Sequence, residues 1–460
     1  MTNEGVHIIV RHLFEKYKVI ALRKRNIMKL EGLILFVFMT MAVCPAVFAK
    51  DLVHYTLNDL CRAANDNAET IRIAEDDVEI ARQEKQRARS VLIPRATAFG
   101  SYTKYKEQGI FTPDTASRGI RLNQSFTLNG RELIAYDVAK KGIETNAFSL
   151  EAIRSAYLLE VTLAYFETLE ARRMLEIAQA DVERLETHKQ AVEEKLRVGS
   201  VTRTDLFRAA AELSRAQTDR EMAQNAVMQT RANIVRITGI DDGFSISDTD
   251  IQRLENVDLS LAQIQAQALE NRFEIKAAQK NLEIAAQTMR YEKGEYWPQL
   301  SLEAGYRKSD VSYGGTLTGI DSGANNEEAY AMAELQFVLF DGGLRTAQVR
   351  QAEARKNQAH ESLNQARNDI ILESKVAYSE YETARKALIN LADELKSAQE
   401  NYHAVQMQYQ YGLADIVDMM DANTLLVQSE RRISNARYAL FQTIFRLVYT
   451  QGELQACVLE

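Results

Sequence analysis

Residues 377–409 read AYSEYETARKALINLADELKSAQENYHAVQMQY, and the fold follows from this stretch. Its apolar and small residues recur at alternating spacings of four and three. They are Ala377, Tyr381, Ala384, Leu388, Leu391, Leu395, Ala398, Tyr402, Val405 and Tyr409. This heptad pattern forms a seam, which packs one helix against a partner helix. No Gly or Pro lies between Gly343 and Gly412, so the pattern predicts one helix about 100 Å long.

The composition agrees with a helical protein. The 460 residues include 4 prolines and 20 glycines, whereas average usage would give about 23 and about 32. With 46% hydrophobic and 26% charged residues, the chain is neither collagen-like nor disordered, and the scarcity of turn residues argues against an all-β sandwich. The net charge of −8 argues against nucleic acid as a partner.

Residues 1–49 have the features of a secretory signal peptide. A basic segment precedes an apolar run over 33–43, and small residues follow up to Ala49. This order of basic, apolar and small residues is typical of export signals that are cleaved. We therefore predict cleavage after Ala49.

Three points about the termini stay open. Translation starts at Met1 or at Met28, which begins a signal of ordinary length. Cys44 raises a lipoprotein alternative, although the residue before it is bulkier than such sites usually accept. After cleavage only Cys61 and Cys457 remain. They either pair in an oxidising compartment or stay as separate buried thiols.

The chain repeats itself once. Gly199 matches Gly412 and Gly239 matches Gly452 at a displacement of 213 positions. The seam of the first half is Ala164, Thr168, Ala171, Leu175, Ala178, Val182, Leu185, Lys189, Val192 and Leu196. We predict a signal peptide over 1–49, a first repeat over 50–250 (helix, strand pair at 94–128, long helices over 130–238, linker) and a second repeat over 251–460 (helix, strand pair at 298–340, long helices over 344–450, C-terminal tail).

Between the helices the hydrophobic pattern changes to a period of two. Pro94 and Pro298 end predicted helices over 64–92 and 259–295, respectively. The predicted strands cover 96–106, 118–128, 300–307 and 330–339. Segments of about ten alternating residues are typical of outer membrane strands, and an interfacial aromatic girdle is a further expectation. Its candidates are Tyr102, Tyr105, Trp297 and Tyr306. Four strands cannot enclose a pore, so several copies would have to pool them.

At its junctions and tips the chain resembles the TolC family of outer membrane channel proteins. The resemblance spans 57–452 and is carried best by 295–302 (EYWPQLSL), 339–343 (LFDGG) and 411–422 (YGLADIVDMMDA). It implies a mainly α fold with a small transmembrane β part: a long α-helical coiled-coil barrel and four strands per protomer. A homotrimer would then form one shared β-barrel in the outer membrane of a Gram-negative bacterium, with a long periplasmic extension.

The resemblance also implies a function. Such channels are passive exit ducts of tripartite export systems for drugs, toxic compounds or secreted polypeptides. They are opened by a periplasmic adaptor protein and an inner-membrane pump or ABC transporter, and they contact outer membrane lipid. The alternative is a periplasmic or surface structural coiled coil without channel activity, which the heptads alone would permit.

An acidic cluster is the candidate channel constriction. Asp415, Asp418 and Asp421 share one helix face, and the resemblance assigns Asp418 and Asp421 to an acidic constriction. In a trimer they would form rings of carboxylates, which favour cations. The alternative is helix capping: Asp415 with Asp418, and Thr202 with Asp205, have capping-box spacing. Asp421 lies beyond the cap.

The resemblance further implies a closed-state link between helices, made by Thr204, Asp205 and Tyr409. This sequence departs from the family pattern twice: Ala414 stands where the best-known member has an arginine, and His188 where it has a glutamine. The closed state is therefore expected to be held differently or more weakly.

Adaptor contact is expected at the hairpin tips, through Val198, Gly199, Tyr411 and Gly412. The simpler interpretation of both glycines is C-capping, which is compatible with that role. Tyr411 would be an anchor if exposed.

Enzymatic motifs are missing from the sequence. It contains no His-Glu-x-x-His, Cys-x-x-Cys, Walker or nucleophile-elbow pattern. The six histidines are scattered. We therefore expect no catalytic residue, no cofactor and no metal site.

Overall fold

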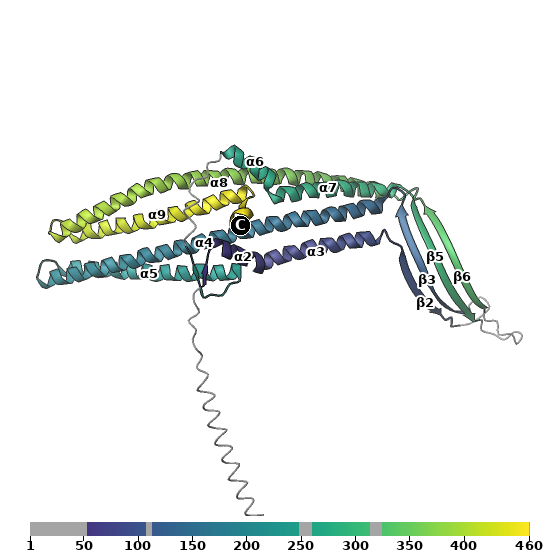
Figure 1. Ribbon diagram of the computed structural model, residues 1–460, viewed down its shortest axis with the longest axis horizontal. Coiled ribbons are helices and arrows are strands. Elements are labelled where there is room, and N and C mark those ends of the chain that lie inside the picture. Colours follow the sequence, from purple (N-terminus) through teal and green to yellow (C-terminus); the bar gives the residue numbers. More distant parts are fainter. Residues whose placement is uncertain (1–52, 107–112, 248–259, 313–323, 460) are drawn as a thin grey trace, which may run out of the picture. The chain divides into compact units, whose positions relative to one another are not determined.

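The computed structural model describes residues 53–106, 113–247, 260–312 and 324–459 (Figure 1). The predicted signal peptide and the predicted boundary between the repeats at 250 lie outside these ranges. The chain divides into two compact units, Met1–Val53 with Gly243–Ser245, and His54–Asp242 with Ile246–Glu460. The second unit contains the described helices and a four-stranded sheet.

The main helices and the strands of the four-stranded sheet follow one another twice in the same order, whereas β1, β4, η2 and α10 each occur in one series only. The first series is β1 (Val53–Tyr55), α2 (Leu57–Asn67), α3 (Glu69–Ser90), β2 (Arg95–Thr103), β3 (Asp114–Thr127), α4 (Arg131–Arg197), α5 (Arg203–Thr238) and β4 (Phe244–Ile246). The second is α6 (Leu261–Asn271), α7 (Phe273–Lys293), the 3-10 turn η2 (Gly294–Tyr296), β5 (Gln299–Ser312), β6 (Ala324–Gln336), α8 (Leu344–Gln410), α9 (Ile416–Thr450) and α10 (Leu454–Leu459).

The corresponding helices have nearly equal lengths. Both α4 and α8 contain 67 residues, and α5 and α9 contain 36 and 35. The shorter helices also correspond, with 11 residues in α2 and α6 and 22 and 21 in α3 and α7. The length of the predicted long helix is therefore confirmed, and it occurs twice.

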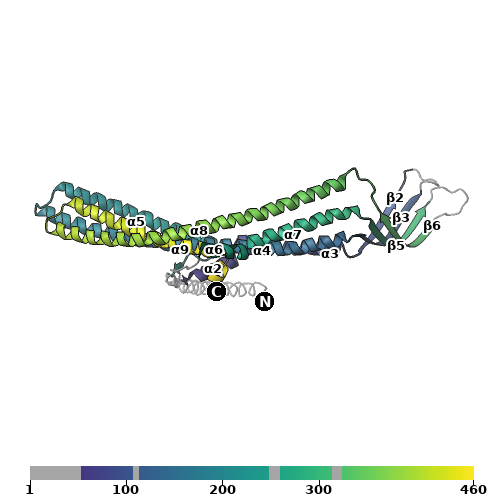
Figure 2. The ribbon, with the colours of Figure 1, turned by 90° about the horizontal axis from the view of Figure 1, so that it is seen from above.

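The long helices pair into two hairpins. α4 packs along α5 and α8 along α9, as Figures 1 and 2 show. None of the twenty predicted seam residues is exposed. Between α4 and α5, for example, Val182, Leu185 and Ala216 form one buried cluster. The heptad prediction is confirmed, because the seam residues are shielded from solvent.

The helices predicted over 64–92 and 259–295 are wrong in one respect: each is two helices. The chain is extended at Ala68 (ψ 123°) and at Arg272 (ψ 127°). In both repeats, the asparagine before the break contacts a glycine that follows a distant long helix. A Cβ on Gly239 would lie 3.2 Å from Cβ of Asn67, and one on Gly452 2.9 Å from Cβ of Asn271. Local periodicity carries no record of these long-range contacts.

The four-stranded sheet is antiparallel throughout, in the order β2-β3-β5-β6. The central pair β3–β5 joins the two repeats, with Phe126 opposite Leu300. β3, β5 and β6 are longer than predicted, whereas β2 ends at Thr103, before the predicted end at 106, and β6 ends at Gln336, before the predicted end at 339. Residues 337–340, partly predicted as strand, lie beyond the sheet, and Leu339 and Phe340 there are exposed.

The two faces of this sheet differ in chemistry, because successive residues of a strand point to opposite sides. The register places Ala96, Ala98, Ile120, Leu122, Phe126, Leu300, Leu302, Ala304, Tyr306, Ala331, Ala333 and Leu335 on one face. It places Arg95, Thr97, Ser101, Arg121, Asn123, Ser125, Ser301, Glu303, Arg307, Glu328, Tyr330 and Glu334 on the other. The first face is largely apolar next to the helices, with Gln124 as an exception, and carries Arg118, Lys308, Asp310 and Glu327 further along the strands. The second face is mainly polar, although Phe99 and Met332 also lie on it.

Two glycine substitutions test the contact at the second helix break. Gly452 has φ +78°, and a Cβ there would collide with Asn271. We expect Gly452→Ala to lower the free energy of unfolding by about 1–3 kcal/mol. Gly142 lies inside α4 with open space around it, so Gly142→Ala should raise this free energy by about 0.5–1 kcal/mol. Denaturant unfolding of both variants in detergent checks this; equal effects would contradict it.

Candidate functional site

The candidate site comprises the two hairpin tips, which share one local structure. Gly199 and Gly412 are left-handed, with φ of 76° and 74°. In both, the glycine N–H donates to the carbonyl three residues earlier, at 3.0 and 3.3 Å. The next N–H donates to the carbonyl five residues earlier, at 2.9 and 2.8 Å. These are Schellman motifs, in which glycine takes the left-handed position at little cost. The C-capping interpretation is confirmed.

Apolar side chains project from both tips. Val198 is 77% exposed at the first tip, and Tyr411 and Leu413 are 74% and 78% exposed at the second. Exposed side chains of this size at a turn are available to a partner. Tyr411 therefore meets the condition set for an anchor.

Both short helices of the hairpins begin with a capping box. The carboxylate of Asp205 accepts the N–H of Thr202 at 2.8 Å, and that of Asp418 accepts the N–H of Asp415 at 3.1 Å. The hydrogen bonds from the Thr202 backbone and hydroxyl lower the pKa of Asp205, so this carboxylate stays charged. Capping is thus confirmed for Asp205 and Asp418. Asp421 lies one turn further along α9 and is exposed.

Tyr409 lies where all four long helices meet. It packs against Val192 of α4, Ala209 of α5, and Ile416 and Met419 of α9. Its hydroxyl is buried and has no hydrogen-bond partner among the described residues. Burial raises the pKa of Tyr409, and the charge of Asp205 raises it further.

The predicted link of Tyr409 with Asp205 and Thr204 is not a hydrogen bond within this chain. The Asp205 carboxylate is instead held by Thr202, and Thr204 is exposed. Asp205 is nevertheless close enough for its charge to act on Tyr409. The link remains a prediction.

Two other side chains do contact Tyr409. The ring of His188 lies 5.2 Å from the Tyr409 ring between centroids. The Lys195 ammonium lies 3.7 Å from the centroid of the Tyr409 ring, and it donates to the Tyr409 carbonyl at 3.1 Å. The sequence marked His188 only as a departure from the family pattern. It gave no sign of Lys195, because one lysine among many on a helix surface carries no periodic signal.

Further along, the two hairpins are joined by polar contacts. The amide of Asn423 on α9 donates to buried Asp181 on α4 at 2.9 Å. Arg184 on α4 pairs with Glu430 on α9 at 3.2 Å. Apolar contacts cross this boundary as well: the ring of Phe166 on α4 stacks on that of Phe441 on α9, with 5.7 Å between centroids.

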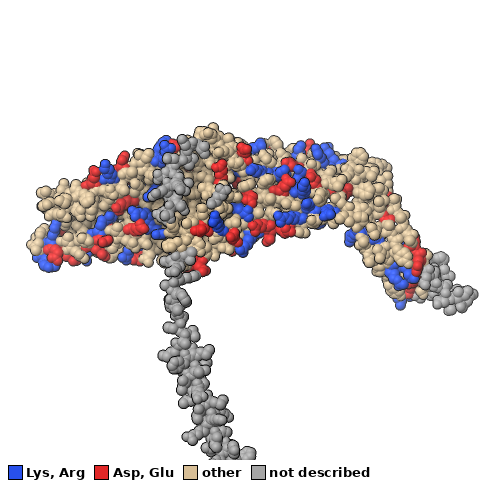
Figure 3. Space-filling view, in the orientation of Figure 1, with Lys and Arg blue, Asp and Glu red and all other residues tan. Residues whose placement is uncertain are grey.

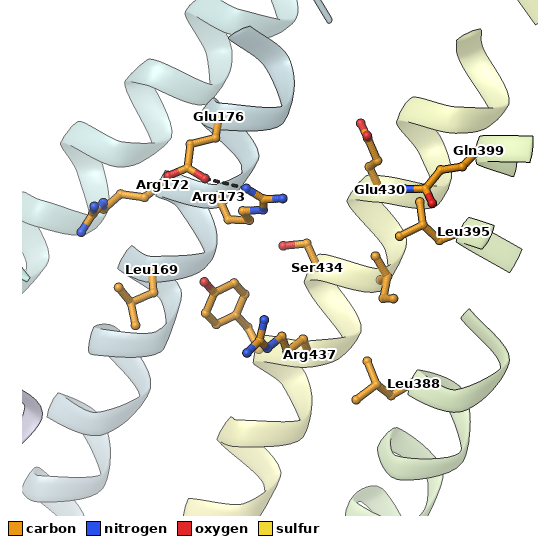
Figure 4. A pocket seen from close by; sticks show the side chains of 12 residues that line it. Leu169, Arg172, Arg173, Glu176, Leu388, Leu395, Gln399, Glu430, Ser434 and Arg437 are labelled. Atoms are coloured by element: carbon orange, nitrogen blue, oxygen red, sulfur yellow. Dashed lines mark hydrogen bonds and ion pairs between the residues drawn. The ribbon is translucent and has the colours of Figure 1, made fainter. Parts of the chain in front are cut away.

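A groove of about 540 Å³ continues this boundary between the hairpins. Figure 4 shows it between α4 and the pair α8 and α9, with Arg173 and Glu176 on one side and Glu430 and Ser434 on the other. Arg173 and Glu176 form an ion pair of 2.7 Å. The boundary between the hairpins therefore contains a hollow whose lining mixes charged with apolar side chains.

The surface charge is mixed. On the face shown in Figure 3, basic and acidic side chains alternate over the helices. This face has no single-sign patch of the kind that binds nucleic acid.

The cysteines and the potential metal ligands give little support for a chemical role. Cys61 is buried on α2 and Cys457 lies on α10, and both are free thiols. Burial raises the pKa of the Cys61 thiol to about 12, so it stays protonated. Within the described ranges, no group of His, Cys, Asp and Glu could hold a metal ion. Of the helices described, none has the length and apolar character required to cross a membrane.

Comparison with known proteins agrees with this architecture. Residues 60–240 and 264–452 match the sequence profile of the family described as outer membrane efflux protein. The chain belongs to this family. It is accordingly an outer membrane protein, and its function is that of an efflux channel. The family is one of channels rather than enzymes.

Individual relatives of the efflux protein are distant but match over most of its length. Outer membrane protein TolC of Vibrio cholerae is 23% identical over 369 residues, covering 80% of this chain and 84% of the relative. Alkaline protease secretion protein AprF of Pseudomonas aeruginosa is 22% identical over 430 residues, covering 89% and 87%. The open state of the MtrE outer membrane channel of Neisseria gonorrhoeae has a TM-score of 0.72 at 19% identity, covering 86% and 89%. This last likeness shows the TolC-like fold.

His188 gives the tip of this efflux protein a dependence on pH. Burial lowers the pKa of His188, and the charge of Lys195 on the same helix lowers it further. The other titratable groups of this cluster are Tyr409 of α8 and Asp205 of α5. Since the pKa of His188 in the folded protein lies below the ordinary value of about 6.5, the stability that neutral His188 contributes is fully present above that pH. It is lost as the pH falls, because the unfolded chain then binds the proton more readily.

Thermal unfolding measures this effect. Between about pH 7.5 and about pH 5.5, the midpoint of the wild-type protein should fall further than that of His188→Gln, which has no titrating ring. Equal falls in both proteins would contradict the assignment to His188.

Proposed function

We propose that three copies of this chain close into one ring that forms the conducting unit of a tripartite export system. The observation that carries the proposal concerns the edges of the larger unit. Its sheet and its row of helices each have two unlike edges, which are open to another chain. The sheet ends in β2 and β6. The helices contact one another in the order α3-α4-α7-α8 on the side of the sheet and α5-α4-α9-α8 toward the tips. A head-to-tail contact between unlike edges closes into a ring when the rotation permits.

The outer helices carry exposed apolar side chains that such a contact would cover. Ile73 and Ile80 lie on α3, Phe207 and Met222 on α5, and Leu372, Val376 and Ile389 on α8, and all are exposed in the single chain. Rows of exposed apolar residues along a helix are typical of surfaces that bind another protein. They support a neighbouring copy at both edges.

The sheet supports a membrane-spanning role within this ring. Its edge strands leave backbone donors and acceptors open, which favours pairing with another chain. Its apolar face suits outer membrane lipid and its polar face a water-filled lumen. Four strands from each of three copies would give one closed β-barrel, in which no edge remains. The number three comes from the resemblance to the TolC family.

The partners follow from the tips. We infer that a periplasmic adaptor protein contacts Val198, Gly199, Tyr411 and Gly412, and that an inner-membrane pump or ABC transporter supplies the energy. The exposure of Val198 and Tyr411 supports this contact. The cargo is a drug, a toxic compound or a secreted polypeptide; the name of the relative AprF, a protease secretion protein, supports the last of these.

The constriction of the proposed channel is assigned to Asp418 and Asp421. Both are exposed on α9 close to the tip. Asp418 also caps α9, so the two roles coincide there. Asp421 takes no part in the cap, and its charge can be tested alone.

Charges on the outer helices should prevent ring formation. Ile80→Glu on α3 and Leu372→Glu on α8 would each bury a carboxylate in the contact between copies. We expect both variants to be monomeric in detergent by light scattering, with the wild type trimeric. Val198→Glu, at a still more exposed apolar residue of a tip, should remain trimeric. A monomeric wild type would contradict the proposed ring and favour a structural coiled coil.

Removing the charge of Asp421 should change ion selectivity. Asp421→Asn is expected to lower the cation-to-anion permeability ratio of single channels in planar bilayers by about twofold. Asp369→Asn, an exposed position on α8 far from the tip, serves as the control. An unchanged ratio in Asp421→Asn would assign the acidic cluster to capping alone.

A further inference from the structure

We propose that Lys195 is a latch that holds the two hairpins of one protomer together at their tips by gripping Tyr409, and so keeps the channel end closed. The proposal rests on the proposed channel function. It adds Lys195 to the residues that contact Tyr409.

Lys195 makes two contacts with the same residue across the hairpin boundary. Its ammonium lies 3.7 Å from the centroid of the Tyr409 ring and 3.1 Å from the Tyr409 carbonyl oxygen. A cation over an aromatic face is attracted by the negative charge of the ring surface, and more strongly when partly desolvated. Tyr409 is buried, so water competes little for this contact.

The position of Tyr409 near the end of α8 strengthens its contact with Lys195. It is the penultimate residue of α8, which ends at Gln410. The carbonyls of the last helical turn carry the negative end of the helix dipole. Lys195 therefore places a positive charge where the end of α8 favours one.

Among the polar contacts described between the hairpins, this one lies closest to the tips. Asp181 with Asn423 and Arg184 with Glu430 join α4 to α9 further along, followed by the hollow groove lined by Arg173 and Glu430. The hairpins also meet in apolar packing, around Tyr409 near the tips and at Phe166 with Phe441 further away. Loss of the Lys195 contact would leave the apolar packing around Tyr409 to hold the tips, and so make their separation easier.

The latch has no counterpart in the other half of the repeat. At the displacement of 213, Lys195 corresponds to Gln408 and Tyr409 to Leu196. In a ring, the equivalent contact between neighbouring copies would therefore pair a neutral amide with an aliphatic chain. The latch acts within a protomer and not between protomers.

The test compares three variants of the full-length protein in detergent. Lys195→Met keeps the length of the side chain and removes its charge, whereas Lys195→Arg keeps the charge. Arg197→Met removes an equal charge two residues away, from an exposed arginine paired with Glu194 on its own helix at 2.6 Å. Spin labels at Val198 and Leu413, in a Cys457→Ser background, report the distance between tips. Planar bilayers report the open probability.

We expect Lys195→Met to broaden the tip distance toward longer values and to raise the open probability about tenfold. Arg197→Met and Lys195→Arg should behave like the wild type. An unchanged distance distribution in Lys195→Met, or an equal change in Arg197→Met, would overturn the latch. If the wild type does not conduct, the proposed channel function fails, while the distances still decide the latch.

Discussion

The structure depends on the burial of one narrow seam along each long helix. α4 and α8 each contain 67 residues, and a helix of that length cannot hide its apolar side inside a globule about 30 Å across. Each seam is instead buried against the shorter helix of its hairpin and against the neighbouring helices. Apolar burial stabilises by about 25 cal/mol per Å², and along such lengths it makes each hairpin one stiff body.

The junction between these stiff bodies has a different chemistry, and this difference matters for a channel. Within a hairpin the contacts are apolar and continuous. Between hairpins, polar links such as Asp181 with Asn423 occur beside apolar contacts such as Phe166 with Phe441, and a groove of mixed lining interrupts the packing. Polar links can exchange for water at modest cost, whereas an apolar seam cannot. Movement is therefore expected more between the hairpins than within them.

The sequence revealed what is local and periodic. The seams, the capping boxes of Thr202 and Asp415, and the glycine caps depend on residues a few positions apart, and the structure has them where they were predicted. The break at Arg272 was missed because it depends on Gly452, far along the chain. Lys195 was missed for the same reason, since its partner lies on another helix more than 200 positions away.

The difference between the tips of the two repeats bears on how many partner molecules a ring could bind. The hairpins are alike in length and caps, but Lys195 and Tyr409 correspond to Gln408 and Leu196. A ring of three copies would thus present six boundaries between hairpins at its end. Three lie within protomers and three between them, in alternation. A partner that recognises either kind would bind three times, and only one that accepts both would bind six times. The chemistry of one lysine thereby constrains the stoichiometry of the whole assembly.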